Sequence, residues 1–428
     1  MGRMVVGIDL SRKYYDVSCL DPGGEVVLDQ RRYAYTPAGA RQMRQTVAAL
    51  IEEHGYDGAE VAAESTGLLW FHLMADLAQH EPDYALYLLN PRDVRKFIQA
   101  MGEEDKTDAK DAYGVADRQR VRRPEHELRL DMPYLALQRL TRYRFSLVQQ
   151  LASEKVRLTN FVYLKASAYM TVKPFSDIFG ATSRQVLSGE LTLDELAALP
   201  TAELAGQLQT FGRQRFAEPE QRAALLKQVA AESFPLPAEM VAAVDTVLDV
   251  GLAHIGGLEQ LIASLDQPIA AAAHELPGYE ILRTIRGIGP VYAAGMVAEI
   301  GDVSRFLEGS KRDHRGRRRG KRRRAAEAAL AKLAGLYWPR KESGEFKGED
   351  RPMSKRGNVY LRYYLIQAAN SVRLNDPCYA AFYARKYREA VRHKHRRALV
   401  LTARKLVRLI FAMLDDEAPY QPKEVATM

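Results

Sequence analysis

Apolar residues near the start of the chain follow strand spacing first and helical spacing later. β-Branched or alternating stretches predict five strands: Met4–Leu10, Tyr15–Leu20, Glu25–Tyr35, Glu60–Glu64 and Ala85–Leu89. Helical spacing occurs at Ala38–Glu53, between the last two strands, and at Asp108–Val121. Strands followed by alternating strands and helices are the order of an RNase H-like fold, so we expect an α/β domain over residues 1–128.

The middle of the chain is almost wholly helical in pattern, from Pro133 to about Ala272. Five apolar residues recur there at steps of seven, four, seven and three: Leu140, Leu147, Leu151, Leu158 and Phe161. Such a stripe is typical both of a coiled-coil seam between subunits and of an ordinary bundle helix. We predict a helical or coiled-coil domain over residues 129–275 whose stripe mediates self-association, giving a homo-oligomer, a dimer or a tetramer.

The last part of the chain, residues 276–428, is predicted to be mostly helical, with long helices at Val359–Leu374 and Ala398–Leu414. It begins with RGIGPVYAA, which has the pattern of a helix-hairpin-helix motif. Gly287 and Gly289 would let backbone N–H groups approach a phosphate at the start of the second helix. The alternative is a plain tight turn between two helices.

Positive charge is concentrated in this last part. The run from Lys311 to Arg324 holds ten Lys or Arg and one Asp, although the whole chain carries a net charge of only +8. A second run, Arg385 to Arg408, holds ten Lys or Arg against one Glu. Clustered cations favour a nucleic-acid partner, and the alternative is a solvated surface. We expect Lys311–Arg324 to form a mobile loop whose arginines contact the nucleic-acid backbone, among them Arg317, Arg318 and Arg319.

Other bulk features predict a cytoplasmic protein that associates with the nucleoid when bound to DNA. The chain has two cysteines and no Cys/His cluster with zinc spacing. Its start, MGRMVVGIDLS, has strand character and does not look like a signal peptide. Apolar runs stay well short of the roughly 18 residues that a membrane span needs, so we expect no membrane association.

Four acids of the first domain could hold a metal ion. Asp9 and Glu64 stand at the ends of predicted strands, and Asp108 and Asp111 share one face of a predicted helix. Magnesium takes such oxygen ligands, with manganese as an alternative, and a pair of ions would stabilise phosphoryl transfer. Each acid also has a structural interpretation, as a turn residue, a helix cap or a first-turn acid.

Three segments carry a resemblance to a known family. They are GIDLS around Asp9, AAESTG around Glu64 and KTDAKDA around Asp108 and Asp111. In this order they resemble the Asp-Glu-Asp-Asp set of the transposases of the insertion-sequence-110 family, whose N-terminal domain is similar to the RuvC Holliday-junction resolvase. The segment LNPRDVRKF, before the third of them, also fits the family. The resemblance implies that the four acids are catalytic metal ligands.

A segment near the C-terminus, WPRKESGEFKGEDRPMSKRGNVYLRYYL, resembles the second signature block of the same family. Ser343 matches the position of the family's catalytic serine, with Ser354 as its main rival. The block implies nucleic-acid contacts from Lys355, Arg356 and Arg362, and Asn358 would equally serve as a helix N-cap. The arginine-rich run departs from the family, in which a shorter and less charged connection is expected.

The resemblance implies a DNA transposase that cuts and rejoins donor and target DNA through a covalent serine–phosphodiester intermediate. It also implies a composite active site across subunits and a structured guide, or bridge, RNA. Two alternatives remain open at this point. One is a RuvC-like Holliday-junction endonuclease that hydrolyses DNA with water, and the other is a non-enzymatic nucleic-acid scaffold.

Overall fold

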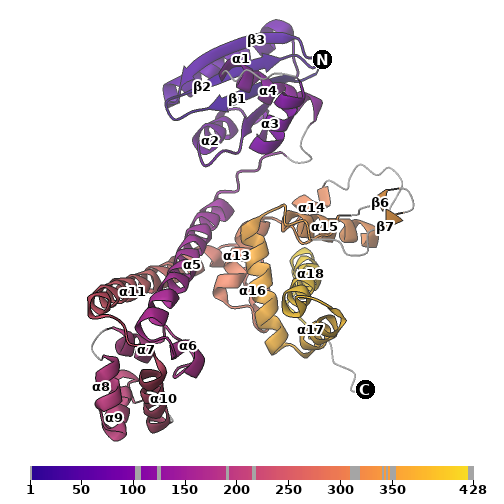
Figure 1. Cartoon of the computed structure of the whole chain (residues 1–428). Coiled ribbons are helices and arrows are strands. Elements are labelled where there is room, and N and C mark those ends of the chain that lie inside the picture. Colours follow the sequence, from indigo (N-terminus) through magenta and orange to yellow (C-terminus); the bar gives the residue numbers. More distant parts are fainter. Residues whose placement is uncertain are drawn as a thin grey trace. The chain divides into compact units, whose positions relative to one another are not determined.

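The chain is described by a computed structural model that covers residues 2–101, 108–122, 127–188, 192–214, 218–308, 319–339, 342–343, 346–347 and 353–422. Contacts between residues divide it into two units (Figure 1). The first is Met1–Met132 with Arg305–Arg322, and the second is Pro133–Ser304 with Arg323–Met428. The division into three domains at residues 1–128, 129–275 and 276–428 stays a prediction.

The first unit is built on a five-stranded mixed sheet of order β3-β2-β1-β4-β5. Its strands are β1 (Met4–Leu10), β2 (Tyr14–Leu20), β3 (Val26–Ala34), β4 (Ala59–Glu64) and β5 (Ala85–Leu89). Strand β2 is antiparallel to both of its neighbours, β1 and β3, whereas β4 runs parallel to β1 and β5 parallel to β4. All five predicted strands and the mixed α/β class of this part are confirmed.

Helices cover both faces of this sheet, because its strands carry apolar residues on each face. The helices are α1 (Pro37–His54), α2 (Trp70–His80), α3 (Pro91–Ala100) and α4 (Asp108–Val121). The unit also includes the short helix α14 (Arg305–Glu308). Val6 and Ile8 share one core with α1 and α2, whereas Val5 packs against α4 on the opposite face. Helix α1 begins at the N-cap Thr36, whose side chain accepts a hydrogen bond from Gly39 N–H.

Two long helices, α5 (Met132–Lys165) and α11 (Ala238–His274), form the first part of the second unit (Figure 1). The chain between them forms α6 (Tyr169–Val172), α7 (Ala181–Leu187), α8 (Leu193–Ala198), α9 (Thr201–Phe211) and α10 (Pro219–Glu232). The long helices cross closely, since a Cβ at Gly251 would lie 2.4 Å from the side chain of Leu158. The expected helical middle is confirmed.

The apolar stripe of α5 is a core within one chain. Leu147 is buried in a cluster with Leu258 and Ile262 of α11, and Leu158 is buried in the larger core of the helical body. The prediction that this stripe mediates self-association is therefore wrong. The reason is that α11, itself strongly apolar, supplies the partner surface inside the same chain. A homo-oligomer stays a prediction that would need another surface.

Among the described residues, α11 is the one helix long and apolar enough to cross a membrane by length and composition. Its apolar composition has another explanation, because Leu248, Ile255 and Leu258 are buried in the cores of the helical body.

Substitutions on α5 distinguish its buried face from its exposed face. We expect Leu147→Ala to lower the free energy of unfolding by about 2 to 5 kcal/mol, through lost burial and a cavity. Tyr143→Ala, on the same helix but at a position that is 61% exposed, is the matched control and should cost within about 0.5 kcal/mol. Urea unfolding of both variants measures this, and equal costs would contradict the intramolecular core.

The C-terminal part of the second unit is a helical bundle. Its helices are α12 (Tyr279–Arg283), α13 (Pro290–Ile300), α15 (Arg319–Leu333), α16 (Val359–Asn375), α17 (Pro377–Glu389) and α18 (Lys394–Asp415), with a hairpin of β6 (Glu342–Ser343) and β7 (Phe346–Lys347). Leu365 of α16 and Ile410 of α18 are among its fully buried side chains. The two long helices predicted here, α16 and α18, are confirmed.

The arginine-rich run is partly helical. Residues 311–318, with Arg317 and Arg318, lie outside the described residues, but α15 already begins at Arg319. Within it Arg323 makes hydrogen bonds of 3.0 and 2.8 Å to the Asp416 carboxylate and one of 2.8 Å to the Ala412 carbonyl. The expected mobile loop is thus wrong for residues 319–324. The Ala-rich sequence that follows favours a helix, and the Asp416 pair fixes its first turns.

Candidate active site and nucleic-acid interface

Two of the predicted acids lie side by side at one edge of the first unit's sheet. Asp9 is the sixth residue of β1, and Glu64 ends the neighbouring parallel strand β4. The register pairs Ile8 with Ala63, so Asp9 and Glu64 occupy the next position on each strand. Both side chains are half-buried. The sheet therefore brings together two acids that are 55 residues apart in the sequence.

Helix α4 passes directly over these strands because Gly7 has no side chain. A Cβ at Gly7 would lie 2.2 Å from the carbonyl oxygen of Ala112 and 2.4 Å from the backbone nitrogen of Ala116. Gly7 stands two residues before Asp9, and thus on the same face of β1. Any larger residue at position 7 would push α4, with Asp111 beside Ala112, away from Asp9.

The first turn of α4 lies toward the sheet edge that carries Asp9 and Glu64. The side chain of Gln119, near the end of α4, donates a 3.2 Å hydrogen bond to Glu60, near the start of β4. Four strand residues rise about 13 Å from Glu60 to Glu64, and eight helical residues rise about 12 Å from Gln119 back to Asp111. Asp111 therefore comes level with Glu64, and Asp108 lies one turn further along; the side chain of Asp108 is outside the described residues.

The acids suit magnesium in their chemistry and in the elements that carry them. All four are carboxylates, which are ligands that magnesium takes, and they come from β1, β4 and α4 at one edge. Within the described part of the chain, however, no three His, Cys, Asp or Glu side chains gather closely enough to hold a metal ion. The four carboxylates are thus suitable magnesium ligands by their chemistry, and their side chains would have to move closer together to bind one ion.

Asp16 is a buried acid beside Asp9 that was not predicted from the sequence. It lies directly opposite Asp9 in the antiparallel register of β1 and β2 and is 1% exposed. Arg32 of β3 donates two hydrogen bonds of 3.0 and 2.9 Å to its carboxylate and stacks on Tyr14, 3.8 Å from the ring centroid. The pair neutralises Asp16 and fixes β2 next to the sheet edge that carries Asp9 and Glu64, which we call the acidic edge. Its only sequence signal is an acid within an apolar strand.

In the second unit, the candidate serine lies in a short hairpin. Ser343 ends β6 and pairs with Phe346 of β7, and its side chain is outside the described residues. The rival Ser354 has a structural role, because its hydroxyl oxygen accepts a 3.3 Å hydrogen bond from Arg356 N–H, and its own N–H donates to the Tyr337 carbonyl at 2.9 Å. The geometry gives Ser354 a role in the local turn.

The residues after Ser354 form a tight turn against the end of α15. Gly357 has φ of +142°, and a Cβ there would lie 2.4 Å from the Leu333 carbonyl oxygen, so only glycine fits. The Arg362 guanidinium donates to the carbonyls of Lys355 at 2.8 Å and Ala334 at 3.2 Å, and burial lowers its pKa. Lys355 and Arg356 are exposed. The Arg362 guanidinium thus already stabilises this turn, and the predicted contact with nucleic acid would have to use its remaining N–H groups.

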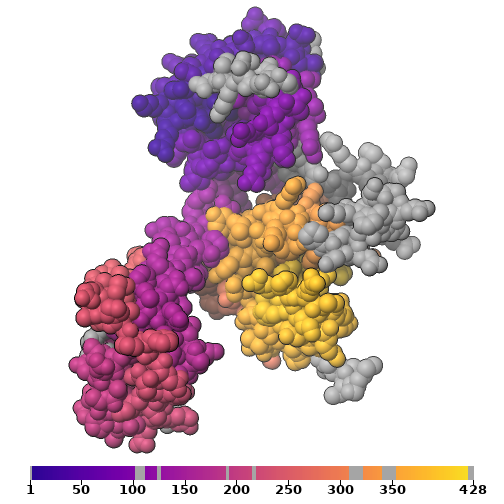
Figure 2. All heavy atoms as spheres, in the orientation of Figure 1, coloured from indigo at the N-terminus to yellow at the C-terminus, as the bar shows by residue number. Residues whose placement is uncertain are grey.

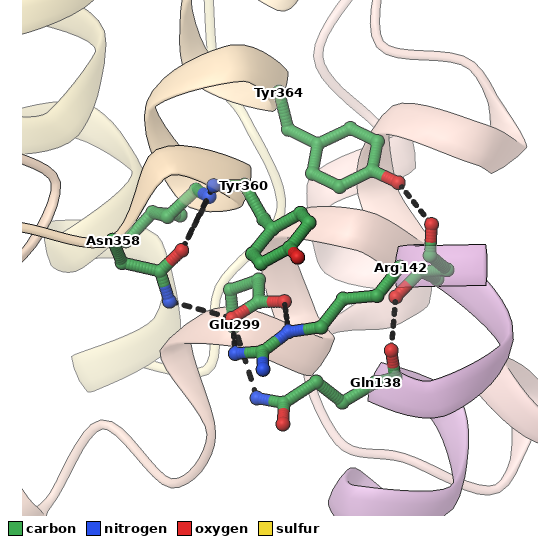
Figure 3. A network of polar contacts seen from close by, with 8 residues as sticks. Gln138, Arg142, Glu299, Asn358, Tyr360 and Tyr364 are labelled. Carbon is green, nitrogen blue, oxygen red and sulfur yellow. Dashed lines mark hydrogen bonds and ion pairs between the residues drawn. The ribbon is translucent and has the colours of Figure 1, made fainter. Parts of the chain in front are cut away.

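Asn358 joins this turn to a buried network (Figure 3). Its side-chain oxygen accepts from Tyr360 N–H and Leu361 N–H and so caps α16, while its Nδ2 donates to Glu299 of α13 at 2.6 Å. Glu299, only 3% exposed, also accepts two hydrogen bonds of 2.8 and 2.9 Å from Arg142 of α5. The N-cap interpretation of Asn358 is confirmed, and one carboxylate holds α5, α13 and α16 together.

The charge of Arg142 is stabilised within this network. Burial would lower the pKa of Arg142, but the hydrogen bonds and negative charge of Glu299 raise it above the ordinary value. The guanidinium also lies 4.6 Å from the ring centroid of Tyr360, and Tyr364 donates to the Thr141 carbonyl at 3.0 Å (Figure 3).

Removing the charge of Glu299 should destabilise the second unit. We expect Glu299→Gln to lower the free energy of unfolding by about 3 kcal/mol, because the half-buried Arg142 would lose its carboxylate partner. Glu280→Gln, at an exposed pair with Arg283, is the matched control and should change it by less than about 0.5 kcal/mol. Urea unfolding compares the two; a small and equal loss in both would show that the network contributes little.

The predicted helix-hairpin-helix residues lie between α12 and α13. Gly287 has φ of +96°, and a Cβ there would lie only 2.9 Å from the backbone of Ser371 and Val372 in α16. Gly289 is exposed and is the N-cap of α13, and a Cβ at this position would have no atom within 4 Å beyond those of its chain neighbours. Packing within the bundle thus accounts for Gly287, and a phosphate contact stays a prediction that suits Gly289 better.

Comparison with known proteins tests the resemblance of both ends of the chain. Residues 6–164, which include the acidic edge, match a family model described as "Transposase". Residues 279–313 and 316–384, which include Ser343 and Asn358, match one described as "Transposase IS116/IS110/IS902 family". The chain is a transposase of the insertion-sequence-110 family. The two matches leave most of the helical body between α5 and α12 uncovered.

Relatives of this transposase share modest identity over long stretches. The "Insertion element IS116 uncharacterized 44.8 kDa protein" of Streptomyces clavuligerus is 26% identical over 99% of this chain and 98% of its own length. The "Insertion element IS900 uncharacterized 42 kDa protein" of Mycobacterium paratuberculosis is 26% identical over 74% of each chain. A "Probable family 20 transposase" of Pseudomonas aeruginosa is 30% identical over 46% of this chain and 53% of its own.

Proposed function

We propose that this transposase cuts and rejoins DNA with Ser343 as nucleophile and a magnesium site formed by Asp9, Glu64, Asp108 and Asp111. The observation that carries the proposal is the convergence of β1, β4 and α4 at one edge, with Gly7 opening the path for α4. The family match supports the DNA substrate and the cutting and joining of strands.

The proposal includes an RNase H-like, RuvC-like fold for the first unit. Its support is the strand order β3-β2-β1-β4-β5, in which three antiparallel strands are followed by two parallel ones. Acids at the ends of the adjacent parallel strands β1 and β4 would then face a bound phosphodiester.

In the proposed reaction the Ser343 hydroxyl attacks a DNA phosphorus. A serine–phosphate bond forms, one phosphorus–deoxyribose oxygen bond breaks, and the serine proton leaves to solvent while the departing strand end takes up a proton. Attack by a second strand's hydroxyl reverses these changes and releases the serine. Bound magnesium would supply charge stabilisation for the phosphate and the developing alkoxide. Exposed Lys355 and Arg356 would hold the DNA backbone beside Ser343.

The proposed partners follow from the family and from charge. Donor and target DNA are the substrates, and a structured bridge RNA would supply sequence recognition. The excess of cations in the last part of the chain supports polyanionic partners. A homo-oligomer would bring Ser343 of one subunit to the acids of another, and the site of action would be the cytoplasmic nucleoid.

A recombination assay tests this function against water hydrolysis. The protein is incubated with a plasmid that carries the element ends and a second plasmid with the target, together with the element's non-coding RNA and magnesium. We expect joined donor–target molecules, detected by amplification across the junction, and none with a chelator. Nicked or linear DNA without joined product would favour the junction-resolving nuclease, and intact DNA the scaffold.

A further inference from the structure

The turn between α17 and α18 carries a dense positive surface. From Arg385 to Arg397 the chain holds one acid and seven Lys or Arg: Arg385, Lys386, Arg388, Arg392, Lys394, Arg396 and Arg397. All of these cations are exposed except Lys386, which is half-buried. We call residues 385–397 the α17–α18 corner. The yellow helices that carry it form part of the surface of the second unit in Figure 2.

The corner is held on a rigid base. Ala390 is buried between the two helices, and Lys405 lies under the rings of Tyr379 and Phe382, 4.4 and 4.8 Å from their centroids. The Tyr383 hydroxyl and His395 Nδ1 share a 2.7 Å hydrogen bond that joins α17 to α18. The cations of the corner therefore project from a fixed framework rather than a flexible tail.

Part of this charge opposes the local helix electrostatics. Cations at the end of α17 are favourable, because the C-terminus of a helix is partially negative. Lys394, Arg396 and Arg397 instead occupy the first turn of α18, at its partially positive end, and that turn holds no acid. The one acid of the corner, Glu389, contacts Lys386 at 2.5 Å and Arg385 at 3.8 Å. A bound polyanion would relieve the excess charge of the remaining cations.

Two exposed apolar or aromatic groups lie among these cations. Val391, in the connection between the helices, is 85% exposed, and Tyr387 is 41% exposed with Lys394 Nζ 5.9 Å from its ring centroid. Proteins that bind nucleic acid commonly surround an apolar wedge or a stacking ring with backbone-binding cations. A purely solubilising surface would not need Val391 exposed at its tip.

We propose that the α17–α18 corner binds the phosphate backbone of a nucleic acid, with Val391 and Tyr387 placed against sugars or bases. The family-model match ends at residue 384, so the corner lies directly beyond the segment that identifies the family. The inference rests on the proposed function only in expecting a nucleic-acid partner. It is independent of Ser343 and of the acidic edge.

Binding is tested in a chelator, so that no strand is cut. The full-length protein is titrated, by fluorescence anisotropy, into a labelled DNA duplex, the same DNA as a single strand, and an RNA hairpin, at several salt concentrations. We expect Arg392→Gln/Arg396→Gln to weaken binding of at least one of these probes roughly 10- to 30-fold. If the probe is duplex DNA, the salt slope should fall by about 1.8, for two lost phosphate contacts.

Two comparisons make the test specific. Arg41→Gln/Arg157→Gln removes the same charge from exposed positions elsewhere and should weaken binding by less than about threefold. Val391→Ser should weaken binding of the same probe without changing its salt slope. Equal effects of both double variants, or no effect of either at unchanged thermal midpoint, would overturn the corner as a binding surface. If the wild type binds none of the three probes, that result would instead contradict the proposed function.

Discussion

Recombination should be lost when any one of Asp9, Glu64, Asp108 or Asp111 is changed to alanine. Magnesium charge stabilisation at a phosphate contributes several kcal/mol, so losing a ligand should slow the reaction by roughly a thousandfold or more. The measurement is the yield of joined donor–target DNA per unit time. Full recombination by Asp111→Ala would show that Asp111 is not a metal ligand. It would also contradict the position of Asp111 beside Glu64 that we infer from the Glu60–Gln119 contact.

Glu60→Gln is the matched control for this prediction. Glu60 lies on the same strand and the same face as Glu64, but it is 4% exposed and its carboxylate accepts from Gln119 at 3.2 Å. Its neutralisation should change the free energy of unfolding and leave recombination within a few-fold of the wild type. Comparable losses of recombination in Glu60→Gln and Glu64→Ala would show that α4 packing alone explains the effect.

Metal binding can be measured without the reaction. Magnesium that binds the folded state only should raise the thermal midpoint of the wild type, because ligand binding adds to folding stability by mass action. The same titration should leave the midpoint of Asp9→Ala unchanged. Without metal, this variant should be at least as stable as the wild type, since one of several neighbouring negative charges is gone. A magnesium shift preserved in Asp9→Ala would place the ion elsewhere.

The five strands of the first unit could be predicted because each is short, apolar and bounded by turn residues, and its helices α1, α2 and α4 because of their helical spacing. Helix α3 was not predicted. The surface that packs against the α5 stripe could not be predicted, since the spacing indicates a buried face but not whether the partner helix belongs to the same chain. The Gly and Arg content of the run that includes residues 319–324 predicts a mobile loop. The alanines that follow, and the contact of Arg323 with Asp416 93 residues away, decide the helix instead.

The candidate site was only partly visible in the sequence. Asp9 and Glu64 could be predicted because each ends a strand, and parallel strands bring such ends together. Asp16 has no comparable signal, because its place opposite Asp9 depends on the β1–β2 register. The contact of Asn358 with Glu299 was equally hidden, since it joins residues 59 positions apart through the packing of three helices.

Ser343→Ala should abolish covalent attachment of the protein to DNA. The serine hydroxyl is a weak nucleophile that needs activation, and a covalent intermediate conserves the phosphodiester energy for rejoining. Alanine removes the attacking oxygen and leaves the β6–β7 backbone pairing intact. Ser354→Ala is the matched control, because that hydroxyl accepts from Arg356 N–H within its turn. It should lose some stability and keep the adduct.

Labelled DNA on denaturing gels shows whether Ser343 becomes joined to a DNA strand. End-labelled donor DNA is incubated with the element's RNA, magnesium and the wild type, Ser343→Ala or Ser354→Ala. We expect label to migrate with the protein for the wild type and Ser354→Ala, and never for Ser343→Ala. An adduct that persists in Ser343→Ala but disappears in Ser354→Ala would move the nucleophile to Ser354, and cleavage without an adduct in any of the three would contradict the serine mechanism.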